Sequence, residues 1–203
     1  MPAKGGRYHH GDLRSALVDA AVDVIGERGV RGFSLAEASR RLGVTTAAPY
    51  RHFADRDELL AAVTARALRV FATMLASAAD AADTPARRLA AMAGAYVRFA
   101  AQQRPLFDTI FSSGLDKSRY PELQRAWEPV DALLTVVLEV CDGDAVTAGA
   151  LSDAVEACAH GHAMLFIDGD YGQGPEAVES AAAKAVAAAQ ALIAGRAALR
   201  PPG

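Results

Sequence analysis

Cysteines, membrane-spanning runs and secretion signals are scarce or missing in this 203-residue chain. The two cysteines, Cys141 and Cys158, fit no metal-ligand spacing and suggest no disulfide framework, so we expect buried thiols, with a redox sensor as the alternative. No run of about eighteen uncharged apolar residues exists to span a bilayer. The N-terminal sequence MPAKGGRYHH lacks the apolar segment of a signal peptide. These absences predict a cytoplasmic protein with no membrane partner.

The chemical motifs of enzymes are missing as well. The sequence contains no nucleophile elbow, phosphate-binding loop, dinucleotide-binding fingerprint or carboxylate-histidine metal pair. His160 and His162 are two residues apart, and on a helix such side chains point in different directions, so we expect no metal site. We therefore predict a protein that is not an enzyme and that uses no cofactor.

Charge is distributed unevenly along the chain. Residues 1–56 contain nine Lys or Arg and six Asp or Glu, a balance of +3, whereas the whole chain has a net charge of -3 and the remainder therefore -6. The acidic total argues against a protein that coats nucleic acid indiscriminately. A basic N-terminal part on an acidic remainder suits a module that makes a few phosphate contacts.

The N-terminal third predicts several closely spaced helices. An amphipathic helix is expected over residues 12–28 and is closed by Gly29. Ser34, with Glu37 three residues later, has the pattern of a capping box, and Gly43 ends the short helix that starts there.

A second short helix is expected directly after this glycine turn. Thr45 or Thr46 can cap it, and it would run through Tyr50 and His52 with Pro49 in its first turn, where the missing N–H costs little. Two short helices around a tight glycine turn are typical of a helix-turn-helix, in which the second helix lies in the DNA major groove.

The chemistry of this second helix suggests how it would contact DNA. Small and hydroxyl side chains at its start would approach base edges, while an aromatic hydroxyl, a histidine and an arginine would donate to phosphate oxygens. The predicted DNA-binding residues are Ser34, Thr45, Thr46, Ala47, Tyr50, His52 and Arg56. The same two-helix pattern occurs in many helical proteins, so the pattern alone leaves DNA binding and a purely structural role open.

The residues themselves carry a more specific signal. The stretch VTTAAPYRHFADRDELL resembles the recognition-helix signature of the TetR/AcrR family of bacterial transcriptional regulators, which has a small polar start, an aromatic-x-His-Phe core and a basic residue opening the fourth helix. The matching residues are Thr45, Tyr50, His52, Phe53 and Arg56, with Arg56 in place of the more usual lysine. The resemblance runs from Tyr8 to Leu60 and implies a dimeric DNA-binding regulator, usually a repressor released by an inducer.

The rest of the chain has helical periodicity and no convincing two-residue alternation of a strand. We expect an all-α fold of about nine helices, with a long helix over residues 56–79 that leads from the N-terminal part into the remainder. The predicted domains are a helix-turn-helix DNA-binding domain with a mobile arm at residues 1–11 (residues 1–56), and a helical ligand-binding and dimerisation domain (residues 57–203). Pro129 is expected to kink or break a helix before residues 133–140.

Two Ala-rich helices end the chain, expected over residues 145–167 and 175–197 around the turn-forming sequence DGDYGQG. Their broad faces of small side chains allow close approach, either inside one monomer or in a two-fold bundle between subunits, and the pattern leaves both open. The family resemblance implies a homodimer through these helices, which would present two heads to a palindromic operator in double-stranded DNA.

A ligand site is expected among aromatic and soft apolar residues of the middle helices, although such stripes are more often core packing. The candidates are Tyr96, Phe99, Phe107, Phe111, Trp127, His160 and Met164. The stretch AHGHAMLFIDG also resembles the motif of a TetR subgroup with a Trp-His-Gly sequence and a later Asp-Gly, although Glu156 stands about where the tryptophan would be. The family resemblance implies a small-molecule effector; the alternative is a helical ligand-binding or redox-sensing dimer that does not bind DNA.

Overall fold

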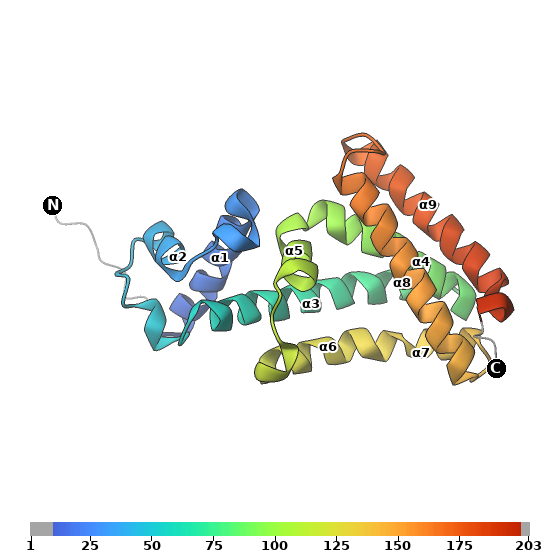
Figure 1. The fold of residues 1–203 in the computed structure, drawn as a ribbon, viewed down its shortest axis with the longest axis horizontal. Coiled ribbons are helices and arrows are strands. Elements are labelled where there is room, and N and C mark those ends of the chain that lie inside the picture. The colour runs from blue at the N-terminus through green and yellow to red at the C-terminus, as the bar shows by residue number, and fades with distance from the viewer. Residues whose placement is uncertain (1–9, 200–203) are drawn as a thin grey trace. The chain divides into compact units, whose positions relative to one another are not determined.

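The computed structural model describes residues 10–199, and over this range all regular structure is helical, with no strand (Figure 1). The prediction of an all-α fold is therefore confirmed. The α-helices are α1 (His10–Gly32), α2 (Leu35–Leu42), α3 (Arg56–Asp80), α4 (Pro85–Gln102), α5 (Arg104–Ser112), α6 (Pro121–Leu133), α7 (Thr135–Val140), α8 (Ala145–Ile167) and α9 (Pro175–Ala194), and the 3-10 helices are η1 (Pro49–Arg51), η2 (Lys117–Arg119) and η3 (Arg196–Leu199). The arm predicted over residues 1–11 falls, up to residue 9, outside the described residues.

The chain forms two compact units. The head unit comprises the described residues up to Ala67 together with Pro105–Arg125, and the body unit comprises Leu68–Arg104 and the described residues from Ala126 onward. Two helices, α3 and α6, continue from one unit into the other. The head unit thus includes α5 and the first turn of α6, and the domain division at residues 56 and 57 stays a prediction.

Local caps account for the start and end of α2. The Ser34 hydroxyl accepts a hydrogen bond from the Glu37 N–H at 3.2 Å, as a capping box requires. Gly43 adopts the left-handed conformation, with φ 66°, and its N–H bonds to the Arg40 carbonyl at 3.1 Å, which ends the helix. Gly29, also at positive φ, interrupts α1 where the sequence predicted its end, although helical turns resume up to Gly32.

The second short helix of the head unit differs from the prediction. Residues 46–48 form a turn, and only the 3-10 helix η1 follows, instead of an α-helix through His52. The physical reason is Pro49, which has no N–H to donate to the carbonyl four residues earlier. Bonds to the third residue back replace the α-helical ones, from Ala48 N to Thr45 O at 3.0 Å and from Arg51 N to Ala48 O at 3.3 Å.

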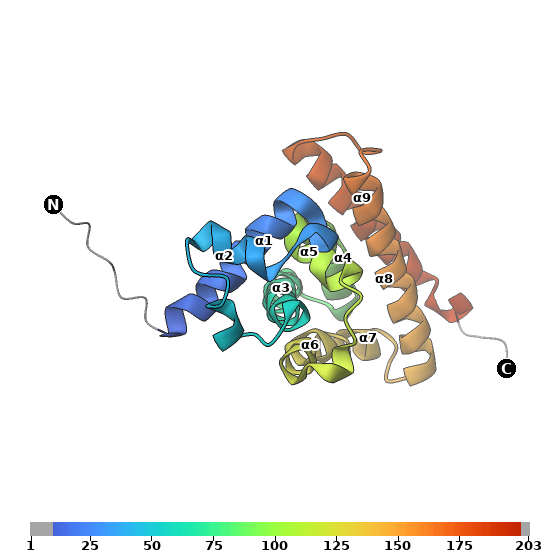
Figure 2. The same cartoon turned by 60° about the vertical axis from the view of Figure 1, so that its left-hand side comes forward.

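In the body unit, α4 packs against both α8 and α9, which lie side by side in both views (Figures 1 and 2). The close approach of α4 and α9 depends on Gly94, because an added Cβ there would lie 2.8 Å from Cγ2 of Val186. Arg98 on α4 makes a bidentate ion pair with Glu179 on α9, with its shortest N–O distance at 2.6 Å. The two C-terminal helices lie where the sequence predicted them: α8 spans the expected residues 145–167, and α9 begins at residue 175 as expected and ends at Ala194.

Helix α6 contains the proline at which a kink or a break was expected. Pro129 lies inside α6, and the break comes later, at Leu134, before α7 begins.

Two of the described helices, α3 and α9, combine length with an apolar composition. By length and composition alone, each could cross a membrane, but core helices of soluble proteins have the same properties. The most apolar stretch of α3 is 67% buried within the chain, whereas that of α9 is only 28% buried. The apolar surface of α9 is therefore largely uncovered in a single copy.

Candidate functional site

The head unit presents one exposed segment, residues 45–52, between α2 and α3. Thr45, Thr46 and Ala47 are exposed, and the Tyr50 side chain is 62% exposed, although large aromatic side chains are usually at least half-buried. His52 is half-buried. The structure thus brings five of the predicted DNA-binding residues together on one short stretch.

This 45–52 segment is anchored at Pro49, in its middle, and at Phe53, directly after it. Pro49 is buried, and its carbonyl accepts from the N–H groups of His52 and Phe53, both at 2.9 Å. The Phe53 ring that follows is 1% exposed and belongs to the core of the head unit. This burial makes Phe53 a core residue and not a base-stacking one. The exposed side chains are therefore displayed from a fixed backbone.

Arg56 has a different environment from the other predicted DNA-binding residues. Its Nε donates to the Phe33 carbonyl at 3.1 Å and its Nη2 to the Val30 carbonyl at 2.6 Å. Its Nη1 contacts the Asp57 carboxylate at 2.9 Å, and the guanidinium lies 5.5 Å from the Phe33 ring centroid. A direct phosphate contact would compete with these bonds, so the geometry favours a clamp that ties the start of α3 to the end of α1.

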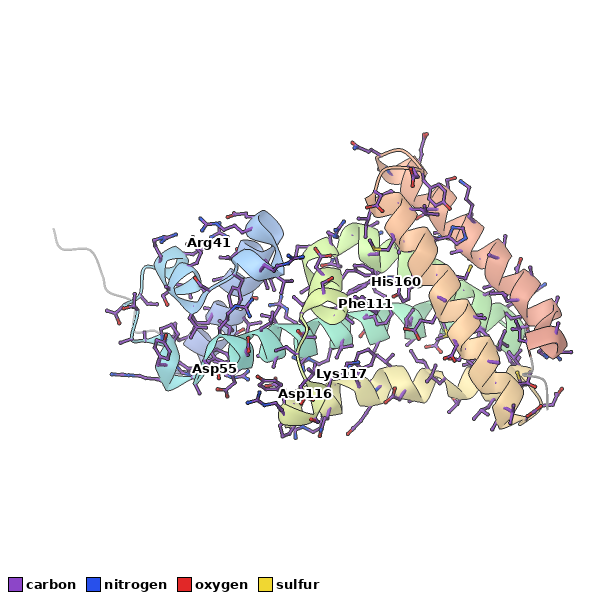
Figure 3. The ribbon with its side chains drawn as sticks, viewed as in Figure 1. Arg41, Asp55, Phe111, Asp116, Lys117 and His160 are labelled. Carbon is purple, nitrogen blue, oxygen red and sulfur yellow. The ribbon has the colours of Figure 1, made fainter. Side chains whose placement is uncertain are left out.

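Ser34 is likewise committed to local structure, because its hydroxyl caps α2. The Glu37 carboxylate of the same cap lies 3.1 Å from Arg28 and also pairs with Arg40. Arg41, labelled on α2 in Figure 3, pairs with Glu27, and this hydrogen bond raises the pKa of Arg41. Part of the basic charge counted in the sequence is therefore neutralised by neighbouring carboxylates.

Sequence reasoning missed one basic residue of this surface. Arg51 is exposed and lies on η1 between Tyr50 and His52, within the 45–52 segment. Its position inside the aromatic-x-His-Phe motif was the available signal, because the variable residue of that motif falls on the exposed 3-10 turn.

The predicted ligand-binding residues divide between the two units. Phe107 and Phe111 contact each other in the head unit, with ring centroids 4.7 Å apart. The other five, Tyr96, Phe99, Trp127, His160 and Met164, belong to the body unit. The structure therefore supports no single cluster of all seven within one unit.

Tyr96 is the centre of the body-unit group. Its hydroxyl lies 2.8 Å from Nδ1 of His160, which is labelled on α8 in Figure 3, and the Phe71 ring meets it edge-on at 5.3 Å. The pKa of Tyr96 is raised well above its usual value, first by burial and then by the charge of Glu156. Tyr96 thus stays a neutral hydroxyl beside the His160 imidazole.

Two cavities in the body unit lie away from that group. One, of about 370 Å³, is lined by residues that include Cys141, Thr147 and Arg196, and the other, of about 200 Å³, by residues that include Arg104, Phe166 and Gly172. Neither is lined by any of the seven candidates Tyr96, Phe99, Phe107, Phe111, Trp127, His160 and Met164. Among the described residues, no group of three or more His, Cys, Asp or Glu could hold a metal ion.

Comparison with known proteins gives the same assignment for both parts of the chain. Residues 17–63 match the family model described as bacterial regulatory proteins of the tetR family, and residues 89–189 match the tetracyclin repressor-like C-terminal domain. The HTH-type transcriptional regulator BetI of Brucella canis is 34% identical over 90 residues, which cover 44% of each protein. The matched region thus spans less than half of that relative's length.

Solved structures resemble the whole fold. A protein with unknown function from Rhodococcus sp. RHA1 has a TM-score of 0.75 and 29% identity, covering 92% of this chain and 98% of its own. A TetR-like transcriptional regulator from the same organism has a TM-score of 0.70 and 19% identity, covering 93% of this chain and 100% of its own. A TetR family transcription regulator from Marinobacter aquaeolei has a TM-score of 0.67 and 18% identity, covering 86% of this chain and 94% of its own. With both family models matched and the exposed 45–52 segment in place, the chain belongs to the TetR family of DNA-binding transcriptional regulators.

Proposed function

We propose that this protein is a cytoplasmic repressor that binds a palindromic operator as a homodimer and leaves it when a small molecule binds the body unit. The observation that carries the proposal is the exposed 45–52 segment on its anchored backbone. One such segment can reach only a few base pairs, so two copies related by a two-fold axis would double the contact area.

Within this segment, position and chemistry divide the proposed roles. Thr45, Thr46 and Ala47 are small and exposed, so they suit direct contact with base edges. Tyr50 and Arg51 are exposed donors and His52 is a half-buried one, and they suit phosphate oxygens. We assign Ser34 and Arg56 to holding the segment, because their polar atoms bond to the protein itself.

The roles predict different effects on binding. The double variant Tyr50→Phe and His52→Ala should weaken binding to good and poor sites alike, because phosphate contacts carry no sequence information. Thr46→Ala should change the preference among sites instead. Fluorescence anisotropy on a panel of single-base operator variants measures both effects. The reverse pattern, with a preference change in the double variant and a uniform loss in Thr46→Ala, would reject these assignments.

The dimer is proposed to form through α8 and α9. The apolar stretch of α9 is only 28% buried within one copy. Gly149 and Gly161 lie inside α8, where an added Cβ would meet nothing within 4 Å, so intrachain packing does not require either glycine. A glycine inside a helix costs about 0.5–1 kcal/mol relative to alanine. Close approach of a second helix is a physical reason to keep both.

For the effector, we propose the surroundings of Tyr96 and His160. The hydroxyl and the imidazole are polar groups bordered by the Phe71 and Phe99 rings, with Phe99 5.0 Å from Phe71. A ligand with an apolar body and one hydrogen-bonding group would fit this chemistry. The competing function is a helical ligand-binding dimer that does not engage DNA.

Footprinting of the purified protein on the DNA upstream of its own gene tests the proposal. The expected result is protection of a site with two related half-sites, and retardation that weakens steeply as salt is added. No retardation of any upstream fragment at low salt would favour the competing function without DNA binding. Release of the DNA by a small molecule from a metabolite panel would then identify the effector.

A further inference from the structure

The geometry points to Arg14 as a positioning residue for the 45–52 segment, held in place by Glu122. This inference rests on the proposed DNA binding and adds residues that neither the helix-turn-helix motif nor the long helix α3 supplies. Arg14 lies on α1, and Glu122 lies in the first turn of α6, 108 positions further along the chain. Both belong to the head unit.

Arg14 makes two contacts at once. Its guanidinium carbon lies 5.1 Å from the centroid of the Phe53 ring, and its Nη2 donates to Oε2 of Glu122 at 2.8 Å. A guanidinium over an aromatic face is attracted by the ring. A carboxylate that accepts a hydrogen bond from the edge of the guanidinium then fixes the orientation of the guanidinium plane. The Arg14 and Glu122 side chains are 45% and 37% exposed, so the ion pair alone contributes little to global stability.

The Phe53 ring connects this contact to the recognition surface. The N–H groups of Phe53 and of His52 before it both bond to the carbonyl of Pro49, which is the first residue of η1. A shift of the Phe53 ring would therefore move the turn that carries Tyr50 and Arg51. Arg14 covers this ring from α1, and Glu122 holds Arg14 there.

The attachment also gives α6 a role. Leu123, next to Glu122, is 1% exposed, and burial together with the nearby charges of Asp57 and Asp55 raises the pKa of Tyr120 just before it. The first turn of α6 is thus fixed to the head unit by an apolar anchor as well as by the ion pair. Because α6 continues beyond Arg125 into the body unit, a change there can reach Glu122 along the helix, and then Phe53 through the two non-covalent contacts of Arg14, a route that is separate from α3.

The test is a mutant cycle in the full-length protein, measured by anisotropy on the footprinted operator and on an unrelated duplex. We expect Arg14→Ala to weaken operator binding by about fivefold to tenfold, and Glu122→Gln by about threefold. The double variant should bind no worse than Arg14→Ala, because Glu122 acts only through Arg14. Binding to the unrelated duplex should change little, so the specificity ratio falls.

The salt dependence of binding and a lysine variant distinguish positioning from a direct phosphate contact. If Arg14 instead touched a phosphate, Arg14→Ala would lower the salt slope by about 0.9, Glu122→Gln would strengthen binding and Arg14→Lys would restore it; any of these results overturns the inference. If Arg14 only positions the segment, the salt slope is unchanged. Arg14→Lys then still binds the operator weakly, because the compact ammonium cannot stack on the Phe53 ring as the planar guanidinium does. Circular dichroism of each variant shows that it is folded.

A second exposed ion pair of the head unit serves as the matched control. Asp19 on α1 pairs with Arg66 on α3, with side-chain exposures of 57% and 43%, and this pair joins neither Phe53 nor α6. Asp19→Asn should leave operator affinity and specificity as in the wild type. If it lowers specificity as much as Glu122→Gln does, the effect belongs to general loosening and the inference is wrong. Absence of operator binding by the wild type would instead overturn the proposed function.

Discussion

At the scale of single residues, the packing of the body unit depends on a glycine. A Cβ at Gly94 would lie 2.8 Å from Val186 Cγ2, so either the Val186 side chain or the two helices α4 and α9 would have to shift. We expect Gly94→Ala to lower the free energy of unfolding by about 1–3 kcal/mol, although alanine is the better helix former. Urea unfolding measures this loss. Adding Val186→Ala should recover part of it, and an unchanged loss in the double variant would contradict the steric cause.

Arg56 provides a second prediction at this scale. Its guanidinium bonds two carbonyls, those of Val30 and Phe33, and lies over the Phe33 ring. A lysine has one ammonium and cannot reproduce this planar fork. Arg56→Lys should therefore destabilise the protein by about 1–2 kcal/mol and speed amide exchange at residues 30–33. If Arg56→Lys keeps both its stability and its affinity for DNA, the phosphate role expected from the sequence is the correct one, because lysine keeps the positive charge.

These long-range contacts mark what sequence patterns could and could not predict. The cap at Ser34 acts within four residues and is found where the sequence predicted it. The bonds of Arg56 reach back 23 and 26 residues, and Arg14 meets a residue 108 positions away. Helical spacing patterns relate only residues that are close in sequence, so they do not predict contacts between distant residues. An arginine that stays exposed and an arginine that bonds to distant carbonyls therefore look alike in the sequence.

At the scale of whole elements, the helices begin and end where local start and stop signals predict, except near prolines. The bounds of α3 and α8 agree closely with prediction because each begins at a recognisable start signal, which is the pair of first-turn acids in α3 and the cap at Asp144 in α8. Pro49 shortened the second helix of the head unit, whereas Pro129 was accommodated inside α6. The two prolines thus have different outcomes because the residues before them fold differently: a turn precedes Pro49, whereas helical turns of α6 precede Pro129.

The junction of α8, α9 and the loop between them contains a histidine that should make stability depend on pH. His162 Nδ1 lies 2.7 Å from the Tyr171 hydroxyl, the rings are stacked, and Lys184 lies 4.3 Å from the centroid of the Tyr171 ring. Burial, followed by the charge of Lys184, lowers the pKa of His162 below 6.5. The folded protein therefore binds this proton less readily than the unfolded chain does.

Because the pKa is lower in the folded state, the contribution of neutral His162 is fully present above pH 6.5 and is lost as the pH falls through the folded-state value. His162→Gln keeps an acceptor for Tyr171 but cannot be protonated. Between about pH 7.5 and pH 5, the wild type should lose more unfolding free energy than this variant. Chemical denaturation at each pH measures the difference, and parallel curves would show that His162 has the same pKa in both states.

At the scale of the whole molecule, the division of charge and the apolar face of α9 belong to one mechanism. A positive N-terminal part on a negative remainder favours approach to DNA through the head unit only. Under the proposed function, two copies held together would raise the operator affinity above that of one short recognition turn. The surface available for that purpose is α9, which is apolar and mostly uncovered in one chain.

A single charged substitution on α9 should therefore disrupt the proposed dimer without unfolding the protein. Ala187 lies exposed in the middle of α9, so Ala187→Glu should be nearly neutral in a monomer but would bury an unpaired carboxylate in a two-fold interface. We expect sedimentation to show monomers and operator affinity to fall by about a hundredfold, because the two half-sites no longer act together. Ala132→Glu, at an exposed alanine of α6, is the matched control and should stay dimeric. If Ala187→Glu also sediments as a dimer, the subunits meet through another face, and the spacing of the two recognition segments must be derived from that face instead.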